Sequence, residues 1–375
     1  MDFQFTEEQV MLRETVARFC RDKYAFDKRQ QLVGETAGGR YWSDLAEMGL
    51  LMVPFAEEDG GVGGSMIEVM LIMQEFGRAL VIEPYLANIV LVGGIVKRLP
   101  DAARRAALLA PLMSGEKRMS LAHAEADNRS SLSMIATFAR KDGGNYVLNG
   151  AKIAVLDGGR SDEIIVSAEV EGAPGVTLFL VPGDASGIER FSYTTVDGFD
   201  AANITLKDVQ VDASAVLGAV AGGIDLLEPT MDEAIVAIAA EGIGVMAYAN
   251  EATLEYTKTR KQFGVPIAGF QALQHRMVDM FIEREQTTSL LYRAAVLSKN
   301  GGVEAQKAAS ILKMQLAKSC RYIGQQAVQL HGGMGIADEA AVAHYFKRLT
   351  IISQQFGTAD VHARRFAALD HPAFR

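Results

Sequence analysis

The chain has 375 residues, of which 49% are hydrophobic and 22% are charged, and its formal net charge is −9 at pH 7. This balance predicts a globular protein with two or three packed layers of core. The acidic charge argues against nucleic acid or an anionic membrane surface as the main partner. The N-terminus, MDFQFTEEQVMLRETVARF, lacks the basic start and apolar run of a signal peptide. No segment is apolar for long enough to span a membrane, so we expect a cytoplasmic protein.

The cysteines do not indicate chemistry. Cys20 and Cys320 lie far apart in the sequence, and neither belongs to a C-x-x-C pair. Isolated cysteines of this kind are typical of reduced structural thiols in a cytosolic protein. We therefore expect neither a metal site nor a redox pair.

Helical signals dominate residues 1–115. TEEQ at residues 6–9 is a capping-box sequence, in which Thr6 and Gln9 satisfy each other's backbone N–H groups. EEDGGVGGS, residues 57–65, contains too much glycine for a helix, whereas residues 65–80 are expected to be helical. This region is predicted to be an N-terminal helical domain.

Residues 116–225 carry signals of β-structure instead. NYVLNGAKIAVL, DEIIVSAEV, GVTLFLVP and ANITLKDVQV are short runs rich in β-branched residues, separated by turn residues. Ile204, Leu206, Val209 and Val211 alternate with one slip, which predicts a β-bulge. Several short strands at this spacing predict a small barrel or sandwich.

Residues 226–375 return to helical patterns. The first long helix begins with EAIVAIAAEGIGVMA, which is so apolar that it should be buried. A later one, AQKAASILKMQLAKSCRYIGQQAVQLHGG, should end at its paired glycines. The predicted fold class is therefore α+β in the order α-β-α, with domains 1–115, 116–225 and 226–375.

Three glycine-containing motifs together carry a resemblance. They are PFAEEDGGVGGS (54–65), RKQFGVPIAGFQALQ (260–274) and QLHGGMGI (329–336). Each is weak alone, but in this order and spacing they resemble the acyl-CoA dehydrogenase family of flavoproteins over the whole chain. The resemblance implies an N-terminal helical domain, a middle β-barrel or sandwich, and a C-terminal four-helix bundle.

The resemblance also implies a cofactor, FAD, lying extended at a subunit interface. Arg260 would set its planar guanidinium against the pyrophosphate, and Phe263 would offer an apolar face to the flavin. Gly332 and Gly333 would let the backbone approach the cofactor without a Cβ in the way. The other residues that the resemblance assigns to the cofactor are Gln271, Gln329 and Thr358. The alternative is that Arg260 and Gln271 are surface residues that flank a turn.

The family reaction, as the resemblance implies, removes two hydrogens across Cα–Cβ of an acyl-CoA thioester and passes electrons to electron-transfer flavoprotein. A carboxylate takes the α-proton while a hydride leaves Cβ for the flavin. Most members place this carboxylate directly before Gly-Thr in a C-terminal loop, where this chain has Phe356. A few place it 26 residues before the arginine of R-x-x-F-G, which gives Ala234. Neither position carries a base.

Glu241 is the remaining candidate for the base, because it interrupts the most apolar part of the chain. It lies seven residues beyond Ala234, on nearly the same helix face and about 10 Å further along. That distance exceeds hydrogen-bond reach, so Glu241 cannot simply replace a base at residue 234. The open alternatives are a catalytic base, a buried structural or pocket carboxylate, and a solvent-facing residue. Asp232 and Glu233, at the expected helix start, are interpreted as complementing the helix dipole.

The β-region departs from the family pattern where it should face the flavin. In AHAEADNRSS, residues 122–131, Glu125 is kept but alanine stands at residue 124 in place of threonine. In KIAVLD, residues 152–157, Ala154 and Leu156 replace an aromatic and a hydroxyl residue. The same-subunit half of the cofactor site is thus predicted to be eroded. The histidines near the motifs have no catalytic partner at motif spacing and are interpreted as structural or surface residues: His123, His275 and His331.

The pattern leaves three hypotheses for function. Within the family, the chain resembles the smaller chain of enzymes built from two unlike members, among them the small subunit of pimeloyl-CoA dehydrogenase. The leading hypothesis is a subunit of an acyl-CoA dehydrogenase, active as a homo- or hetero-tetramer with another family chain. The second is a catalytically silent partner that completes the FAD site of a larger chain. The third is a family offshoot with other flavin chemistry, such as a lyase or a monooxygenase.

Overall fold

The computed structural model describes residues 4–35, 39–127 and 131–371. The chain divides into two compact units, which are described separately. The first, called the helical unit, comprises Met1–Gln31, Ser65–Val81 and Ile235–Arg375. The second, called the sheet unit, comprises Leu32–Gly64 and Ile82–Ala234. No helix among the described residues combines the length and apolarity needed to cross a membrane.

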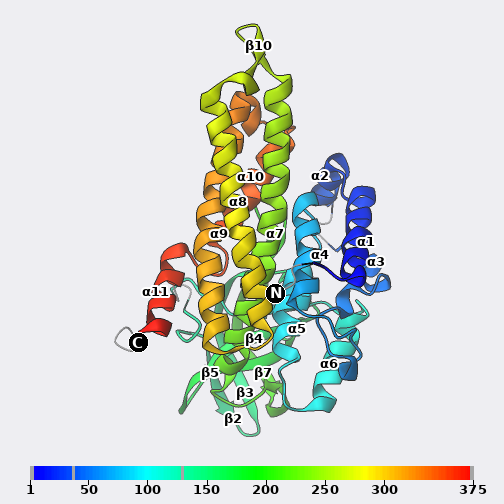
Figure 1. Ribbon diagram of the computed structural model, residues 1–375. Helices are drawn as coiled ribbons and strands as arrows, with labels where there is room; N and C mark the ends of the chain where they lie inside the picture. The colour runs from blue at the N-terminus through cyan, green and yellow to red at the C-terminus, as the bar shows by residue number, and fades with distance from the viewer. Residues whose placement is uncertain (1–3, 36–38, 128–130, 372–375) are drawn as a thin grey trace. The chain divides into compact units, whose positions relative to one another are not determined.

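Long helices make up the helical unit. Two helices are shared with the sheet unit: α2 (Phe26–Glu35) begins in the helical unit and ends in the sheet unit, and α7 (Gly223–Thr259) begins in the sheet unit and ends in the helical unit. Figure 1 shows α7, α8 and α9 running side by side. Helix α9 packs against α8, α10 and α11, and α1 packs against α4. The bounds are α1 (Glu7–Lys23), α4 (Met66–Ala79), α8 (Gln271–Ser298), α9 (Gly302–His331), α10 (Ala341–Gln354) and α11 (Ala359–Asp370).

The helix ends follow from local sequence. The predicted capping box at Thr6 and Gln9 is confirmed at the start of α1, and Ser65 with Glu68 forms a second one at the start of α4. Helix α9 stops at Gly332, whose φ of +61° is readily adopted only by glycine, as the paired glycines predict. Both cysteines are buried free thiols, in agreement with the sequence.

Two glycines let α4 and α7 approach each other closely. A Cβ added at Gly77 would lie 2.0 Å from the carbonyl oxygen of Glu241, and one at Gly244 would lie 2.0 Å from the carbonyl oxygen of Gln74. Real side chains do not approach backbone oxygens so closely, so only glycine fits at either crossing point. The stretch Ile235–Met246 of α7 is buried as predicted and is apolar apart from Glu241. The close approach at the two glycines packs α4 against this stretch.

Gly244→Ala is expected to lower the free energy of unfolding by about 1–3 kcal/mol, because the new methyl group must push two helix backbones apart. Urea unfolding of the full chain measures the change. Gly144→Ala is the matched control, because a Cβ there meets nothing within 4 Å. Equal loss of stability in both variants would mean that the helix crossing is not responsible.

A single sheet organises the sheet unit, in the strand order β6-β7-β3-β2-β4-β5-β8, with β1 paired to β4. β1 and β2 run parallel to β4, and the other pairs are antiparallel. The sequence predicts β3, β4, β5 and β7, and it misses β1, β2, β6 and β8. The strands are β1 (Met119–Ala122), β2 (Phe138–Asp142), β3 (Asn145–Leu156), β4 (Glu163–Val170), β5 (Ala173–Pro182), β6 (Ile188–Thr194), β7 (Asp200–Asp212) and β8 (Val216–Leu217).

The predicted bulge in β7 is confirmed. Leu148 pairs with Val209 but Gly150 pairs with Leu206, so β7 has one more residue than β3 across this step. Asp208 takes up the extra residue with φ +51°. The slip keeps all four alternating apolar side chains of this strand in the core.

Short helices complete the sheet unit and join its strands through buried polar groups. Asn88 accepts a hydrogen bond from the backbone N–H of Met119 (2.6 Å) and donates one to Asp157 (2.8 Å). Asp157 also forms a buried ion pair with Arg118. The short helical segments are α3 (Trp42–Glu47), η1 (Leu50–Met52), η2 (Glu57–Asp59), η3 (Leu86–Val92), α5 (Gly93–Val96), α6 (Ala102–Met113) and η4 (Ala213–Ala215).

One prediction about α7 is wrong. Asp232 and Glu233 do not stand at its start, because α7 already begins at Gly223. Glu233 instead forms ion pairs with Lys97 (2.9 Å) and Arg98 (2.7 Å). The first turns of α7 cannot be predicted from the sequence, because Pro229 lies within them and proline normally ends a helix.

Candidate functional site

A tight hairpin follows α7 and holds Arg260 at its base. Strands β9 (Lys261–Gln262) and β10 (Val265–Pro266) form the hairpin, which Figure 1 labels at the tip of the long helices. The N–H of Arg260 donates to Tyr256, and its carbonyl accepts from Ile267 (2.9 Å). The guanidinium is exposed and makes no hydrogen bond or ion pair with any residue that the structure describes. It is free to bind an anion.

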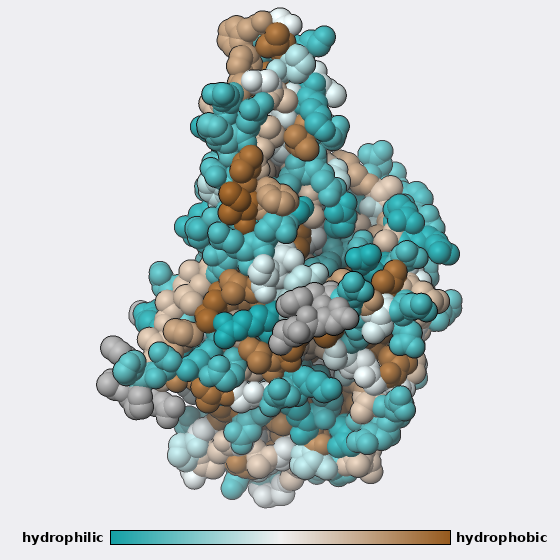
Figure 2. All heavy atoms as spheres, viewed as in Figure 1, coloured by the Kyte–Doolittle hydropathy of each residue, from teal (hydrophilic) through white to brown (hydrophobic). Residues whose placement is uncertain are grey.

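The turn of this hairpin is strained and exposed. Phe263 and Gly264 have φ of +55° and +81°, which is the pattern of a type I′ turn. A bulky residue is uncommon in this conformation, yet the Phe263 side chain is 93% exposed and gains little from its own chain. Val265 and Phe270 are exposed beside it, and Figure 2 shows apolar atoms gathered at this tip. A strained aromatic on an open apolar tip indicates a surface that another molecule covers.

The glycine motif lies at the same end of the helical unit. The Tyr256 hydroxyl donates to the carbonyl of His331 (3.2 Å), and the two rings stack with centroids 4.4 Å apart. This contact joins the end of α7 to the turn at Gly332 and Gly333. A Cβ on either glycine would meet nothing within 4 Å, so their backbone faces open space. Gln329 on the last turn of α9 and Gln271 at the first residue of α8 are both exposed.

In the sheet unit, Glu125 is held inside the protein. The fully buried Lys152 donates to Glu125 (2.7 Å) and to Ser167 (3.0 Å). Burial alone would raise the pKa of Glu125, but hydrogen bonds from Lys152, Thr137 and the N–H of Ala136 lower it to about 2. Burial lowers the pKa of Lys152 to about 8. With its oxygens committed to these donors, Glu125 is a structural carboxylate rather than a group free to move protons.

Two further residues of the segments that the sequence predicts to face the flavin, His123 and Ala154, have hydrogen-bond partners within the chain. His123 is buried against Ser167 (3.0 Å), and burial together with the Lys152 charge lowers its pKa to about 4, so it is neutral. Ala154 is exposed with φ +50°, and its N–H donates to Asn203 (3.1 Å). Residues 128–130 of AHAEADNRSS lie outside the described residues.

Neither familiar base position carries a carboxylate. Phe356 precedes Gly357 and Thr358 in the turn between α10 and α11, with φ +60°. Its carbonyl accepts a hydrogen bond from Nε2 of His362 (2.8 Å). Ala234 is fully buried within α7. An apolar side chain at either position can shape a site but cannot accept a proton.

Glu241 is buried and paired with an arginine. Nε of Arg348 lies 2.6 Å from Oε1, and the second guanidinium contact lies 2.7 Å from Oε2. Each residue is only 3% exposed, so the pair is a desolvated, bidentate ion pair. Replacing Glu241 by a neutral residue would leave Arg348 buried without a counter-charge, which is costly. This is the geometry of a structural ion pair.

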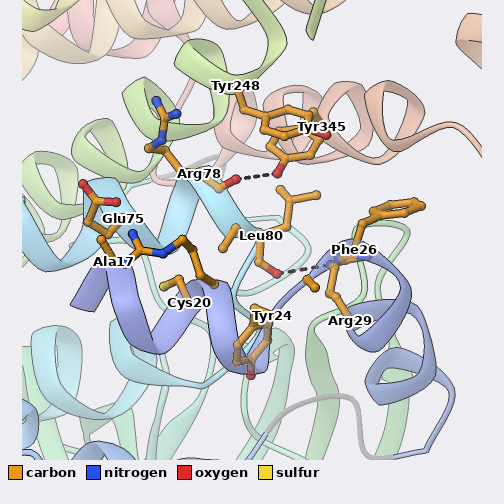
Figure 3. Close-up of a pocket in the computed structure, with 13 residues that line it drawn as sticks. Ala17, Cys20, Tyr24, Phe26, Arg29, Glu75, Arg78, Leu80, Tyr248 and Tyr345 are labelled. Carbon is orange, nitrogen blue, oxygen red and sulfur yellow. Dashed lines mark hydrogen bonds between the residues drawn. The ribbon is translucent and has the colours of Figure 1, made fainter. Parts of the chain in front are cut away.

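A separate pocket of about 330 Å³ opens within the helical unit, as Figure 3 shows. Tyr248 and Tyr345 stack at its wall with ring centroids 3.9 Å apart. Arg21, Arg29, Arg78 and Glu75 are the charged residues that line it. Arg78 is paired with Glu251 (2.7 Å), and Arg29 donates to the carbonyl of Leu80 (3.1 Å). None of the residues that the motifs indicate lines this pocket.

Family models of three successive domains match this chain from residue 6 to residue 368. Models of the N-terminal, middle and C-terminal domains of acyl-CoA dehydrogenase match residues 6–116, 120–209 and 221–368.

The chain belongs to the acyl-CoA dehydrogenase family.

Individual relatives cover nearly the whole chain. The probable acyl-CoA dehydrogenase YngJ of Bacillus subtilis is 30% identical over 375 residues, covering 96% of this chain and 97% of that protein. Subunit CarC of the caffeyl-CoA reductase–Etf complex of Acetobacterium woodii is 27% identical, covering 95% and 96%. A solved chain of the Tcur3481–Tcur3483 steroid ACAD is 27% identical, with a TM-score of 0.88 and 98% of both chains covered. The expected acyl-CoA dehydrogenase fold, helical then β then helical, is confirmed.

Membership makes the chain an oxidoreductase of the acyl-CoA dehydrogenase family, with FAD as cofactor. The donors at the hairpin end fit an extended dianion: a free guanidinium, two exposed amides and a glycine turn open to solvent. Phe263 adds an apolar face. Bound FAD supplies the two-electron acceptor of the acyl-CoA dehydrogenase reaction.

Sequence reasoning missed the partners that fix the acyl-CoA dehydrogenase chain's buried charges. Arg348 stands 107 positions from Glu241, and Lys152 stands 27 positions from Glu125. A signal existed for Lys152, because it occupies an inward position in an alternating strand. Arg348 gave no comparable signal, since HYFKRLT mixes polar and apolar residues without a strand-like alternation.

Proposed function

We propose that the chain is one subunit of an FAD-dependent acyl-CoA dehydrogenase that introduces a double bond between Cα and Cβ of an acyl-CoA thioester. A second family chain in the same oligomer supplies the catalytic base. Electrons leave through electron-transfer flavoprotein. In this assembly the chain is the smaller partner, and its compartment is the cytoplasm.

The observation that carries this proposal is the absence of a free carboxylate at each candidate position. Phe356 and Ala234 cannot accept a proton, and Glu241 is committed to Arg348 through two short hydrogen bonds. The α-proton of a thioester is weakly acidic, so its removal needs a positioned base. A subunit without one requires the base from elsewhere in the oligomer.

The chain's own residues act on the cofactor in this proposal. Arg260 binds the pyrophosphate through its fork of N–H groups, and Phe263 covers an apolar face of the cofactor. Gln271 and Gln329 hydrogen-bond the nucleotide, while Gly332 with Gly333 and Thr358 border it. The hairpin end is exposed and strained without a partner, which supports binding of the cofactor where two subunits meet.

Two relatives support an assembly of unlike chains. The steroid ACAD named for Tcur3481 and Tcur3483 matches this chain over 98% of its length. CarC is named as a subunit of a complex with Etf. We extend both features to this chain: a second dehydrogenase chain as partner, and electron-transfer flavoprotein as acceptor.

The isolated chain is expected to reduce a dye with acyl-CoA substrates at least about 100-fold more slowly than the mixed enzyme, because general-base catalysis is worth that much or more. The measurement is turnover with a panel of acyl-CoAs for the chain alone, the larger family chain alone, and both co-expressed.

The matched control replaces the glutamate before Gly-Thr in the larger chain by glutamine. If that carboxylate is the base, the co-expressed pair loses turnover while its flavin stays bound. Fast turnover by the isolated chain would contradict the proposal. A mixed enzyme in which this chain has no effect on either flavin content or turnover would also contradict it.

A further inference from the structure

The end of α10 is closed by a lysine from another helix. A helix leaves its last four carbonyls without intrahelical partners. In α10 these belong to residues 351–354. The carbonyl of Ile351 accepts from Gln355 (2.9 Å), and that of Gln354 accepts from Gly357 (3.2 Å). The carbonyls of Ile352 and Ser353 each accept a hydrogen bond from Nζ of Lys313, at 3.1 Å.

The surroundings of Lys313 suit a neutral amine. Its side chain is fully buried on α9 and forms no ion pair with any carboxylate in the described part of the chain. Two acceptors, the carbonyls of Ile352 and Ser353, match the two N–H groups of a neutral amine. The third N–H of an ammonium has no acceptor among the described residues. Burial accordingly lowers the pKa of Lys313 from 10.5 to about 8.

The loop that follows is held a second time, from α11. Nε2 of the buried His362 donates to the carbonyl of Phe356 (2.8 Å). A Cβ on Gly357 would lie 3.0 Å from the same nitrogen, so the loop lies directly against the ring. Phe356 and Gly357, with φ of +60° and +105°, are thereby kept in a conformation that a free loop would rarely adopt.

We propose that Lys313 is a positioning residue that fixes the loop Gln355–Thr358 by closing the end of α10, and that the proton on its amine sets how firmly the loop is held. The loop's role beside the flavin rests on the proposed function. The hydrogen bonds by which Lys313 and His362 fix the loop do not depend on that proposal.

The direction of the pH effect follows from linkage. An open loop exposes Lys313 to water and returns its pKa toward 10.5, so the open form binds a proton more tightly than the closed form. Raising the pH above 8 therefore favours the closed loop. Between pH 7 and pH 9 the opening equilibrium should fall about tenfold, given a pKa of about 8 closed and 10.5 open.

The thiol and the imidazole nearest Lys313 keep their protonation states across this range. Burial raises the pKa of Cys320 to about 12, and it lowers that of His362 to about 4. The other charged groups that act on these two residues are the ion-paired Glu241 and Arg348 beside Cys320 and the guanidinium of Arg365 beside His362. Lys313 is therefore the group in this cluster whose pKa falls within the range.

Hydrogen exchange of the full-length protein tests the proposal. The amides of Gln355 and Gly357 are followed from pH 7 to pH 9, with each rate divided by the intrinsic rate at that pH. Wild type should show the tenfold fall. Lys313→Met and Lys313→Arg should show none, because neither side chain titrates in this range. Lys318→Met is the control, since Lys318 lies on the same helix with its side chain 62% exposed, and it should keep the wild-type fall.

A flat wild-type profile, or the same fall in Lys313→Met, would overturn the proposal. If the variants fail to fold, wild type alone decides, because amides within α8 should show no such fall. Flavin content of the assembled protein is measured in parallel. Loop opening in Lys313→Met with unchanged flavin content would overturn the loop's place beside the flavin. Exchange requires neither substrate nor turnover, so it is independent of the proposed reaction.

Discussion

Glu241→Gln is expected to lower the free energy of unfolding by about 3–5 kcal/mol, because it leaves the guanidinium of Arg348 buried without its counter-charge. Thermal and urea unfolding measure the loss. Flavin reduction by the assembled enzyme should continue at temperatures where the variant is folded. Both results follow from a structural ion pair in which neither oxygen of Glu241 is free.

The double variant Glu241→Gln with Arg348→Met is the control. Removing both charges relieves the unpaired guanidinium, so most of the lost stability should return, and the two changes should be strongly non-additive. Wild-type stability in Glu241→Gln combined with abolished flavin reduction would identify Glu241 as the base. Additive losses would mean that the pair does not act as a unit.

The direction of this prediction depends on the structure. Seen in the sequence, Glu241 is a lone carboxylate in an apolar helix, and a buried structural role predicts that glutamine is tolerated or even stabilising. The ion pair with Arg348 reverses the expected sign of the stability change, since Glu241→Gln then creates an unpaired buried charge rather than removing one.

Arg260→Ala is expected to lower flavin content well below that of wild type. A charge-assisted hydrogen bond to an anion contributes about 1.5–3 kcal/mol, which corresponds to a roughly 10- to 100-fold weaker Kd. Absorbance per chain after purification and titration of the apoprotein with FAD measure the effect. The folded state should be unaffected, because the guanidinium has no partner within the described chain.

Two variants make the Arg260 test specific. Arg260→Lys keeps the charge but loses the planar fork, so its affinity should lie between those of wild type and the alanine variant. Arg293→Ala removes an exposed arginine from α8 and should leave flavin content unchanged. Full flavin content in Arg260→Ala would exclude this residue from the cofactor site.

Much of the fold was predictable because its signals are local. The capping box at Thr6, the glycine stop at Gly332 and the slip beside Asp208 each depend on a few neighbouring residues. The missed strands β1 and β8 have four and two residues, and such short runs are strands only because a neighbour pairs with them. The first turns of α7 were missed because Pro229 resembles a helix boundary.

The sequence motifs name candidate cofactor residues, but they do not specify the contacts of those residues. Arg260 and the glycine turn lie at the same end of the helical unit, where Tyr256 accepts from the backbone N–H of Arg260 and donates to the carbonyl of His331. The sequence cannot show that Glu241 and Arg348 share one ion pair, or that Lys313 caps a helix 39 and 40 positions away. Such pairings depend on helix packing, which no local pattern specifies.

Glu241 also joins three helices mechanically. Its backbone carbonyl packs directly against Gly77 of α4, and its side chain forms the ion pair with Arg348 of α10. Close-packed interiors transmit displacement rather than absorb it. We therefore expect that a shift of α4 would displace this turn of α7 and, through the ion pair with Arg348, would also displace α10 and the loop that follows it.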